Sequence, residues 1–255
     1  RQYYNMGCVE MMLQGMMPNW GGGGGGIDFP GLLELVFRNG AENMAGETGA
    51  KTGPMESLET FDDFMEAFCE QIRHRVQQCR RNAEKEDEAW EGRYYDPFAS
   101  CMVMDCLENG RDVFQGGARY GRRRAIGGYG LGTTADSLAA IRQFVYGERK
   151  LSLAELFEAL RNNYEGYPEL QRMLDTRTPR YGNDLEEVDE LARQVFEVYA
   201  DAVHALNDGS LQGRFCTSVF SYNHHVYGAE TIAATPDGRG RAEPMSDAIG
   251  PVQGK

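Results

Sequence analysis

A long amphipathic segment constrains the fold of this chain more than any other feature. Thr60 can cap the start of a helix, and Asp62 and Asp63 fall in its acidic first turn. The charged residues after Arg80 predict that the helix continues, solvated, to about Glu91. Apolar side chains recur at three- and four-residue steps and form one stripe of this helix: Phe61, Phe64, Met65, Phe68, Ile72 and Val76.

The other periodic segments are shorter. The clearest strand is 215–222, which mixes aromatic and β-branched residues with Ser and Thr. Residues 1–14 follow neither pattern and are expected to form a loop off a strand, and the glycines 21–26 are expected to form a flexible loop. A second glycine-dense segment, 116–132, carries Tyr120 and four arginines. Helices alternating with short strands and glycine-rich turns predict an α/β fold. Helices are predicted at 29–38, 97–108, 136–146, 152–162, where Ser152 and Glu155 have capping-box spacing, and 184–204.

Composition excludes several classes of protein. The chain has 255 residues, of which 41% are hydrophobic, so it can bury the core of one large domain or two small ones. The longest apolar run, 30–37, is far shorter than the roughly 20 residues that span a bilayer. The net charge of -13 argues against a nucleic-acid partner, because most of the surface would repel phosphate.

Cysteine usage indicates a reducing compartment. A chain of this length has its own core and carries no visible secretion signal, so we expect free thiols in the cytoplasm. All the cysteines except Cys8 are expected to be small buried hydrophobic residues. No metal site is expected, since Cys101 and Cys106 form a lone pair and the adjacent His224 and His225 suit one metal poorly.

Two glycine-containing segments resemble anion-binding motifs but lack their defining residues. Residues 49–52 lack the Gly-Lys adjacency of a phosphate loop, and the glycines of 128–132 are misplaced for a dinucleotide fingerprint. The arginines 122–124 could bind an anion, but a solvated or interdomain charge cluster is the more common meaning of such a run. On a strand, the two adjacent histidines 224–225 would point to opposite faces, so at most one could serve a given site.

Five segments together resemble the glycyl radical enzymes, the pyruvate formate-lyase-like family. They are 7–10 (Gly-Cys-Val-Glu), 116–120 (Gly-Gly-Ala-Arg-Tyr), 135–141, 179–184 and 225–254 with its Ala-Thr-Pro-Asp-Gly-Arg turn. The resemblance spans essentially all 255 residues but only the later middle of a much longer family chain. It implies that 1–255 is a partial catalytic barrel domain, part of a ten-stranded α/β barrel.

The resemblance also implies a chemistry. In the family, a radical SAM activating enzyme installs a glycyl radical, which abstracts hydrogen from a cysteine on a finger loop, and the thiyl radical then attacks a small organic substrate. Cys8 matches this cysteine and Glu10 its acidic partner, a general base or acid. The whole protein is then an anaerobic lyase with no bound cofactor, and a homodimer is expected.

Physical chemistry supports the same two residues. A thiol is the one side chain whose hydrogen exchanges reversibly with a carbon centre, and such chemistry needs a dry, preorganised cavity. Glu10 can reach the same substrate, and the nearby Tyr3, Met6 and Met11 could raise its pKa toward that of a useful base.

Three departures from the family pattern limit the expectation. The chain contains no glycyl-radical motif, so the 255 residues alone are expected to be inert even with an activating enzyme. Cys8 follows glycine rather than cysteine, which disfavours pyruvate formate-lyase itself. Met11 and Met12 stand where the diol, choline and hydroxyproline branches tend to continue with Pro and a Gly-Lys pair, which disfavours those substrates. The bond that is cleaved, C–C, C–O, C–N or C–S, stays open.

Other interpretations remain. The chain could be a non-catalytic structural remnant or a split subunit, or an ordinary α/β enzyme that uses Cys8 as a nucleophile. If 215–222 is an inner barrel strand near Cys8, then Ser221 and His225 could bind substrate, although bonding of these side chains to the backbone is about as common.

Overall fold

The computed structural model describes residues 3–5, 11–18, 23–207, 209 and 215–255. The chain forms two compact units. Unit 1 comprises Arg1–Gly26, Val76–Gly127 and Ala200–Ser218, and unit 2 comprises Ile27–Arg75, Gly128–Tyr199 and Val219–Lys255.

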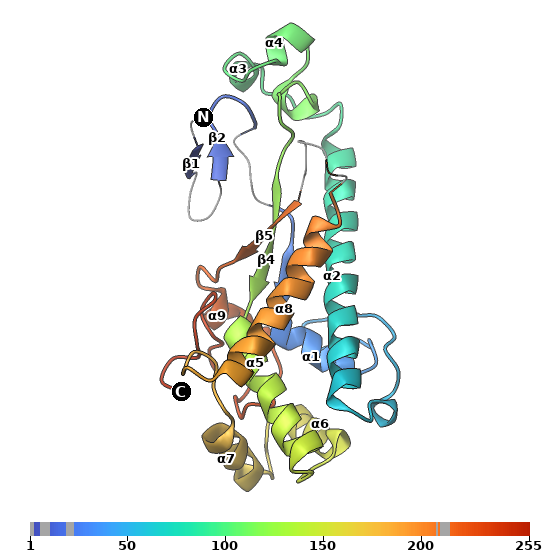
Figure 1. Cartoon of the computed structure of the whole chain (residues 1–255). Coiled ribbons are helices and arrows are strands. Elements are labelled where there is room, and N and C mark those ends of the chain that lie inside the picture. The colour runs from blue at the N-terminus through green and yellow to red at the C-terminus, as the bar shows by residue number, and fades with distance from the viewer. Residues whose placement is uncertain (1–2, 6–10, 19–22, 208, 210–214) are drawn as a thin grey trace. The chain divides into compact units, whose positions relative to one another are not determined.

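Unit 1 contains a pair of strands where the sequence predicts a loop. β1 (Tyr3–Asn5) pairs antiparallel with β2 (Met11–Leu13), and the register sets Tyr3 against Leu13 and Asn5 against Met11 (Figure 1). Three paired positions are too few to produce a recognisable alternation in the sequence, so these strands could not be predicted from the sequence pattern.

The helix predicted at 97–108 is wrong as a continuous element. α3 (Pro97–Ser100) and α4 (Cys106–Asn109) are single turns, and Asp105 between them has a left-handed backbone with φ of 73°. The Asp96 carboxylate caps α3 by accepting a bond of 2.9 Å from the Ala99 amide. The buried side chains here do not form the apolar stripe of a regular helix. They form a small cluster instead, which consists of Cys106, Val113 and Ala118 and includes the start of a 3₁₀ turn at Val113–Gln115.

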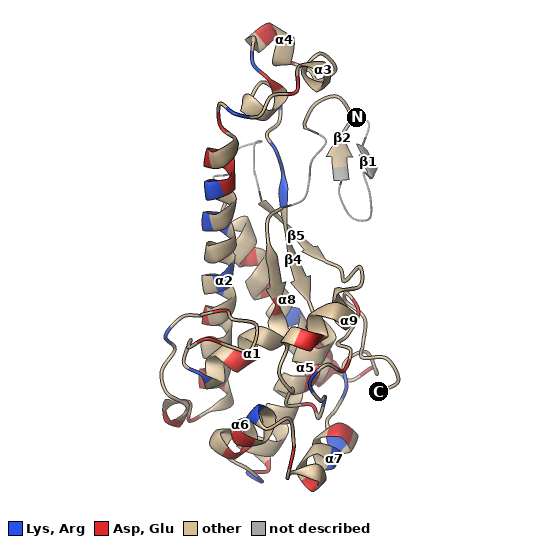
Figure 2. Ribbon diagram, turned by 180° about the vertical axis from the view of Figure 1, so that it is seen from behind, with Lys and Arg blue, Asp and Glu red and all other residues tan. Residues whose placement is uncertain are grey.

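The long helix is confirmed. α2 (Phe61–Trp90) begins with Thr60 and Asp63 bonded to each other, as the capping pattern predicts. Its later turns carry acidic and basic side chains along their length (Figure 2). The side chains of its apolar stripe that are completely buried are Phe64, Phe68, Ile72 and Val76.

A three-stranded sheet has the order β3-β4-β5, with β3 at Gly26–Asp28, β4 at Arg124–Tyr129 and β5 at Phe215–Val219. β3 begins at the last glycine of the loop predicted at 21–26, and β4 lies in the glycine-dense segment 116–132, where the sequence predicts no strand. In β4, a Cβ atom on Gly128 would lie 2.8 Å from the ring of Phe29, so glycine is required by close packing and not by a turn. β5 is confirmed but ends three residues earlier than predicted.

Two helices follow these strands directly. α1 (Phe29–Phe37) continues β3 and is buried along its whole length. α5 (Leu131–Ala140) follows β4 through Gly130, whose φ is 72°, and a Cβ atom there would lie 2.8 Å from Pro30. α5 starts five residues before its predicted position, because buried Gly and Thr residues in its first turn give no apolar period in the sequence. The helix continues as a π-helix at Ile141–Gly147.

The rest of unit 2 is largely helical and contains paired aromatic rings. α6 (Leu153–Arg161) has the predicted capping box, while α7 (Pro168–Arg177) was not predicted. α8 (Glu186–His204) is confirmed, and its residues up to Tyr199 belong to this unit. Phe37 stacks on Phe157 at 5.4 Å, and Phe29 meets Tyr199 edge-on at 5.5 Å. A short helix α9 (His224–Tyr227) and a 3₁₀ turn at Gly228–Thr231 follow β5.

Among the described residues, no helix is both long enough and apolar enough to cross a bilayer.

Candidate functional site

The two predicted catalytic residues, Cys8 and Glu10, lie outside the described residues. They belong to the segment 6–10 that joins β1 to β2 in the chain, and the described strands on either side pair through Asn5 and Met11. Their burial and their distance from β5 are therefore not tested, and their roles stay predictions.

The carboxyl ends of the three sheet strands meet in unit 2. Asp28 is the last residue of β3, Tyr129 is the last of β4, and Phe220 follows β5. The rings of Tyr129 and Phe220 have centroids 6.0 Å apart, and His224 on α9 contacts both Asp28 and Tyr129. In open α/β sheets, the carboxyl ends of the strands are the usual place for a ligand.

Asp28 and His224 form a carboxylate–imidazole pair there. Asp28 occupies the N-cap position of α1, yet its side chain does not cap the helix; it lies 2.8 Å from Nε2 of His224 instead. This hydrogen bond raises the pKa of His224, and partial burial opposes the rise. Burial, and then the charge of Asp28, raises the pKa of Tyr129, whose ring centroid is 4.2 Å from that of the imidazole.

Gly228 makes this arrangement possible. A Cβ atom at this position would lie 2.5 Å from Nε2 of His224, so any larger residue would push the imidazole away. The sequence gives little sign of the cluster, because Asp28 and His224 are 196 positions apart.

Ser221 and His225, the weak substrate-binding predictions, hold the backbone of the segment that follows. The Ser221 hydroxyl accepts a bond of 2.6 Å from the Ala248 amide, and the His225 carbonyl accepts one from Met245. Nδ1 of His225 lies 3.7 Å from Asp247, beyond hydrogen-bond distance. The expectation that His224 and His225 alternate on a strand is wrong, because both lie on α9. A substrate role for Ser221 and His225 stays a prediction.

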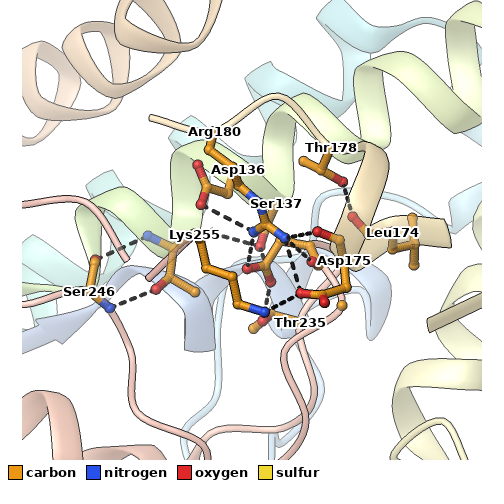
Figure 3. A network of polar contacts seen from close by, with 12 residues as sticks. Asp136, Ser137, Leu174, Asp175, Thr178, Arg180, Thr235, Ser246 and Lys255 are labelled. Carbon is orange, nitrogen blue, oxygen red and sulfur yellow. Dashed lines mark hydrogen bonds and ion pairs between the residues drawn. The ribbon is translucent and has the colours of Figure 1, made fainter. Parts of the chain in front are cut away.

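A second polar cluster is buried in unit 2 (Figure 3). Nη1 of Arg180 lies 3.2 Å from Asp136 and 3.0 Å from Asp237, and the Tyr181 amide donates to Asp136 at 2.7 Å. Thr235 donates its hydroxyl proton to Asp237 at 2.5 Å. Burial raises the pKa of Asp136 to about 7. The cluster ties α5 to the segment after α7 and to the turn before Arg239, three of the segments that carry the family resemblance, so these segments have a structural role.

The arginine run 122–124 is not simply a solvated cluster. Arg124 is completely buried and forms bonds of 2.6 Å to both Glu86 and Asp87 on α2. Arg122 lies over the ring of Trp90 at 4.4 Å, and only Arg123 is exposed. The expectation of a solvated charge cluster therefore holds for Arg123 and is wrong for Arg124, because acidic residues one turn before the end of α2 supply counter-charges that the sequence does not reveal.

The cysteines follow the expectation only in part. Cys69, Cys79 and Cys106 are buried, but Cys101 is exposed and Cys216 is half-buried. Within the described ranges, no group of three or more His, Cys, Asp or Glu side chains could hold a metal ion.

Comparison with known proteins identifies the class. Residues 1–228 match the family described as pyruvate formate lyase-like, and the chain belongs to this family of glycyl radical enzymes. Among solved structures, it superimposes with a TM-score of 0.88 on the Roseburia inulinivorans protein of 1,2-propanediol dehydration, at 32% identity over 99% of this chain and 32% of that one. It superimposes with a TM-score of 0.86 on the B12-independent glycerol dehydratase from Clostridium butyricum, at 31% identity over 99% of this chain and 31% of that one.

Curated relatives agree. The chain is 32% identical to trans-4-hydroxy-L-proline dehydratase of Clostridioides difficile over 90% of its own length and 29% of the relative's. It is also 32% identical to (2S)-3-sulfopropanediol dehydratase of Klebsiella oxytoca over 99% of its own length and 30% of the relative's. The chain thus spans about 30% of the length of these relatives. The predicted fold class is confirmed, because this α/β segment matches part of the ten-stranded α/β barrel of glycyl radical enzymes.

Proposed function

We propose that this chain is the cysteine-loop segment of a glycyl radical dehydratase, in which a thiyl radical on Cys8 attacks a small hydroxylated substrate. The observation that carries the proposal is the family match over residues 1–228, which includes the Gly-Cys-Val-Glu segment. The β1–β2 pair supports it, because a finger loop requires its flanking residues to lie together and Asn5 is paired with Met11. Several relatives with similar sequences are named dehydratases, which favours cleavage of a C–O bond although Met11 and Met12 depart from the pattern of the diol and hydroxyproline branches.

The two residues have complementary tasks. Cys8 in its thiyl form takes a hydrogen atom from a substrate carbon that bears a hydroxyl group, and it returns the hydrogen after the neighbouring hydroxyl has left as water. Glu10 accepts the proton of the hydroxyl on the radical carbon, which becomes a carbonyl, and supplies a proton to the departing oxygen. A carboxylate on the same loop can serve as base and acid in turn if its surroundings raise its pKa.

The oxidising equivalent comes from a glycyl radical installed by a radical SAM activating enzyme. This enzyme and the small-molecule substrate are the proposed partners, the whole protein is proposed to be a homodimer, and its chemistry is suited to an anaerobic cytoplasm.

Electron paramagnetic resonance and product assays test the proposal together. The natural protein that carries this chain is expressed anaerobically with a radical SAM activase and assayed with 1,2-propanediol and glycerol, which carry hydroxyl groups on neighbouring carbons. Cys8→Ser should abolish turnover and keep the glycyl doublet, and Glu10→Gln should lower turnover by at least about 100-fold. Cys101→Ser and Glu91→Gln, at exposed positions, are the matched controls and should leave turnover unchanged. Turnover that survives Cys8→Ser would refute the proposal, and neither a doublet nor turnover in the wild type would favour the structural remnant.

A further inference from the structure

The imidazole of His224 is held on three sides. Asp28 lies 2.8 Å from its Nε2, the ring of Tyr129 lies against one face at 4.2 Å, and only a glycine at position 228 leaves room behind it. About one third of the side chain is nevertheless exposed, 35%. Because Nε2 faces Asp28, the second ring nitrogen, Nδ1, is left for a partner other than Asp28.

The charged groups around this imidazole define what such a partner can be. Asp28 approaches it from β3, and the tyrosine of β4 is neutral, since its pKa is raised. Glu47, whose pKa is raised chiefly by burial, lies close enough to Asp28 to feel its charge and is paired with Arg75. On α9 itself, Nδ1 of the adjacent His225 lies 3.7 Å from the carboxylate of Asp247. The surroundings are acidic, so they disfavour an anionic ligand.

We propose that Asp28, His224 and Tyr129 form a binding site for one hydroxyl group of a small neutral polyol, with Nδ1 of His224 as the hydrogen-bond partner. A hydroxyl group can donate to Nδ1 of the neutral imidazole and accept from Nδ1–H of the protonated one, so it fits both states of the ring. A carboxylate can only accept, and it would meet the negative charge of Asp28. The Tyr129 and Phe220 rings offer apolar contact to the carbon chain of such a ligand.

Asp28 is the positioning residue of this site. Its carboxylate fixes the orientation of the ring and favours the protonated form, while its position at the end of a sheet strand fixes the carboxylate. The choice of a polyol as the class of ligand rests on the proposed function, whereas the geometry of the three side chains does not.

Nuclear magnetic resonance on the protein labelled with ¹³C at histidine tests the site without any radical. The chain has four histidines, so each Cε1–Hε1 signal can be followed, and the signal lost in His224→Gln is that of His224. Titration with glycerol should move this signal saturably in the wild type. Asp28→Asn should lower the pKa of His224, because the hydrogen bond that raises it is weakened, and should weaken glycerol binding by about tenfold. His204→Gln, an exposed position, is the matched control and should change neither.

Three outcomes would overturn the site: a His224 signal that ignores glycerol, equal glycerol binding in Asp28→Asn, or a response to acetate without one to glycerol. If Asp28→Asn does not fold, His224→Gln tests the site instead. The glutamine amide can still donate a hydrogen bond to Asp28, but the side chain has no equivalent of Nδ1. Saturation-transfer contacts from glycerol should disappear in that variant, and their survival refutes the site. If the chain binds glycerol at His224 but the natural protein gives neither a glycyl doublet nor turnover with its activase, the proposed function is refuted and the site stands.

Discussion

The guanidinium of Arg180 lies 3.0 Å from the carboxylate of Asp237, and both side chains are more than nine-tenths buried, with 8% and 2% exposed. The carboxylate of Asp136 lies 3.2 Å from the same nitrogen, so one buried cation is paired with two buried carboxylates. Buried ion pairs are strongly destabilising to break, because removal of one partner leaves an uncompensated charge. This cluster should therefore control the stability of unit 2.

Asp136 should make stability depend on pH. Its pKa in the folded protein is about 7, chiefly because of burial, against an unfolded value of 3.8. Between about pH 4 and pH 7 the folded state keeps a proton that the unfolded state has released, so the free energy of unfolding falls as the pH rises through this range. We expect a fall of roughly 2 kcal/mol between pH 5 and pH 7.5 that is absent in Asp136→Asn.

Urea unfolding at several pH values measures this fall. Asp201→Asn, at an exposed position of α8, is the control and should retain the slope of the wild type. Parallel pH profiles for wild type and Asp136→Asn would contradict the assignment.

Replacement of Arg180 by Met should destabilise the protein by about 3–5 kcal/mol, because two buried carboxylates lose their cation. The loss should be smaller at pH 5 than at pH 8, since protonation of the carboxyl groups removes the unpaired charge. Thermal and chemical unfolding measure both effects. Arg172→Met, on the exposed side of α7, should have little effect, and an equal loss in the two variants would argue against the shared ion pair.

The adjacent arginines of unit 1 should differ sharply. Arg124 is completely buried against Glu86 and Asp87, so Arg124→Met should cost about 3–5 kcal/mol. Arg123 is exposed, and Arg123→Met should change the free energy of unfolding by less than about 0.5 kcal/mol. Similar urea midpoints for the two variants would show that Arg124 does not stabilise this unit.

The capping box of α6 should be worth about 1 kcal/mol. The Ser152 hydroxyl accepts a bond from the Glu155 amide at 3.2 Å, and the Glu155 carboxylate accepts one of 2.8 Å from the Ser152 amide. Ser152→Ala should lower the free energy of unfolding by this amount, measured by urea unfolding. Ser57→Ala, at an exposed serine outside a helix cap, is the control, and an equal effect there would exclude a capping role.

Several elements could be predicted from the sequence because their signals are local. The apolar stripe of α2 repeats at the helix period, which the backbone alone sets. The capping box of α6 lies within residues 152–155. The family of the protein, with Cys8 and Glu10 as its candidate catalytic pair, also follows from short contiguous segments whose order is visible along the chain.

Tertiary structure alone decided the rest. Residues 116–132 contain β4 because Gly128 lets the ring of Phe29 approach, a contact that composition cannot reveal. Arg124 is buried because α2 brings Glu86 and Asp87 to it from 38 and 37 positions away. Asp28 turns from its helix cap to His224, 196 positions later, because the strand ends converge. Each of these contacts joins residues that are distant in the chain. The free energy of burying a charge or packing a ring depends on the partner that the fold supplies and not on the adjacent residues in the sequence.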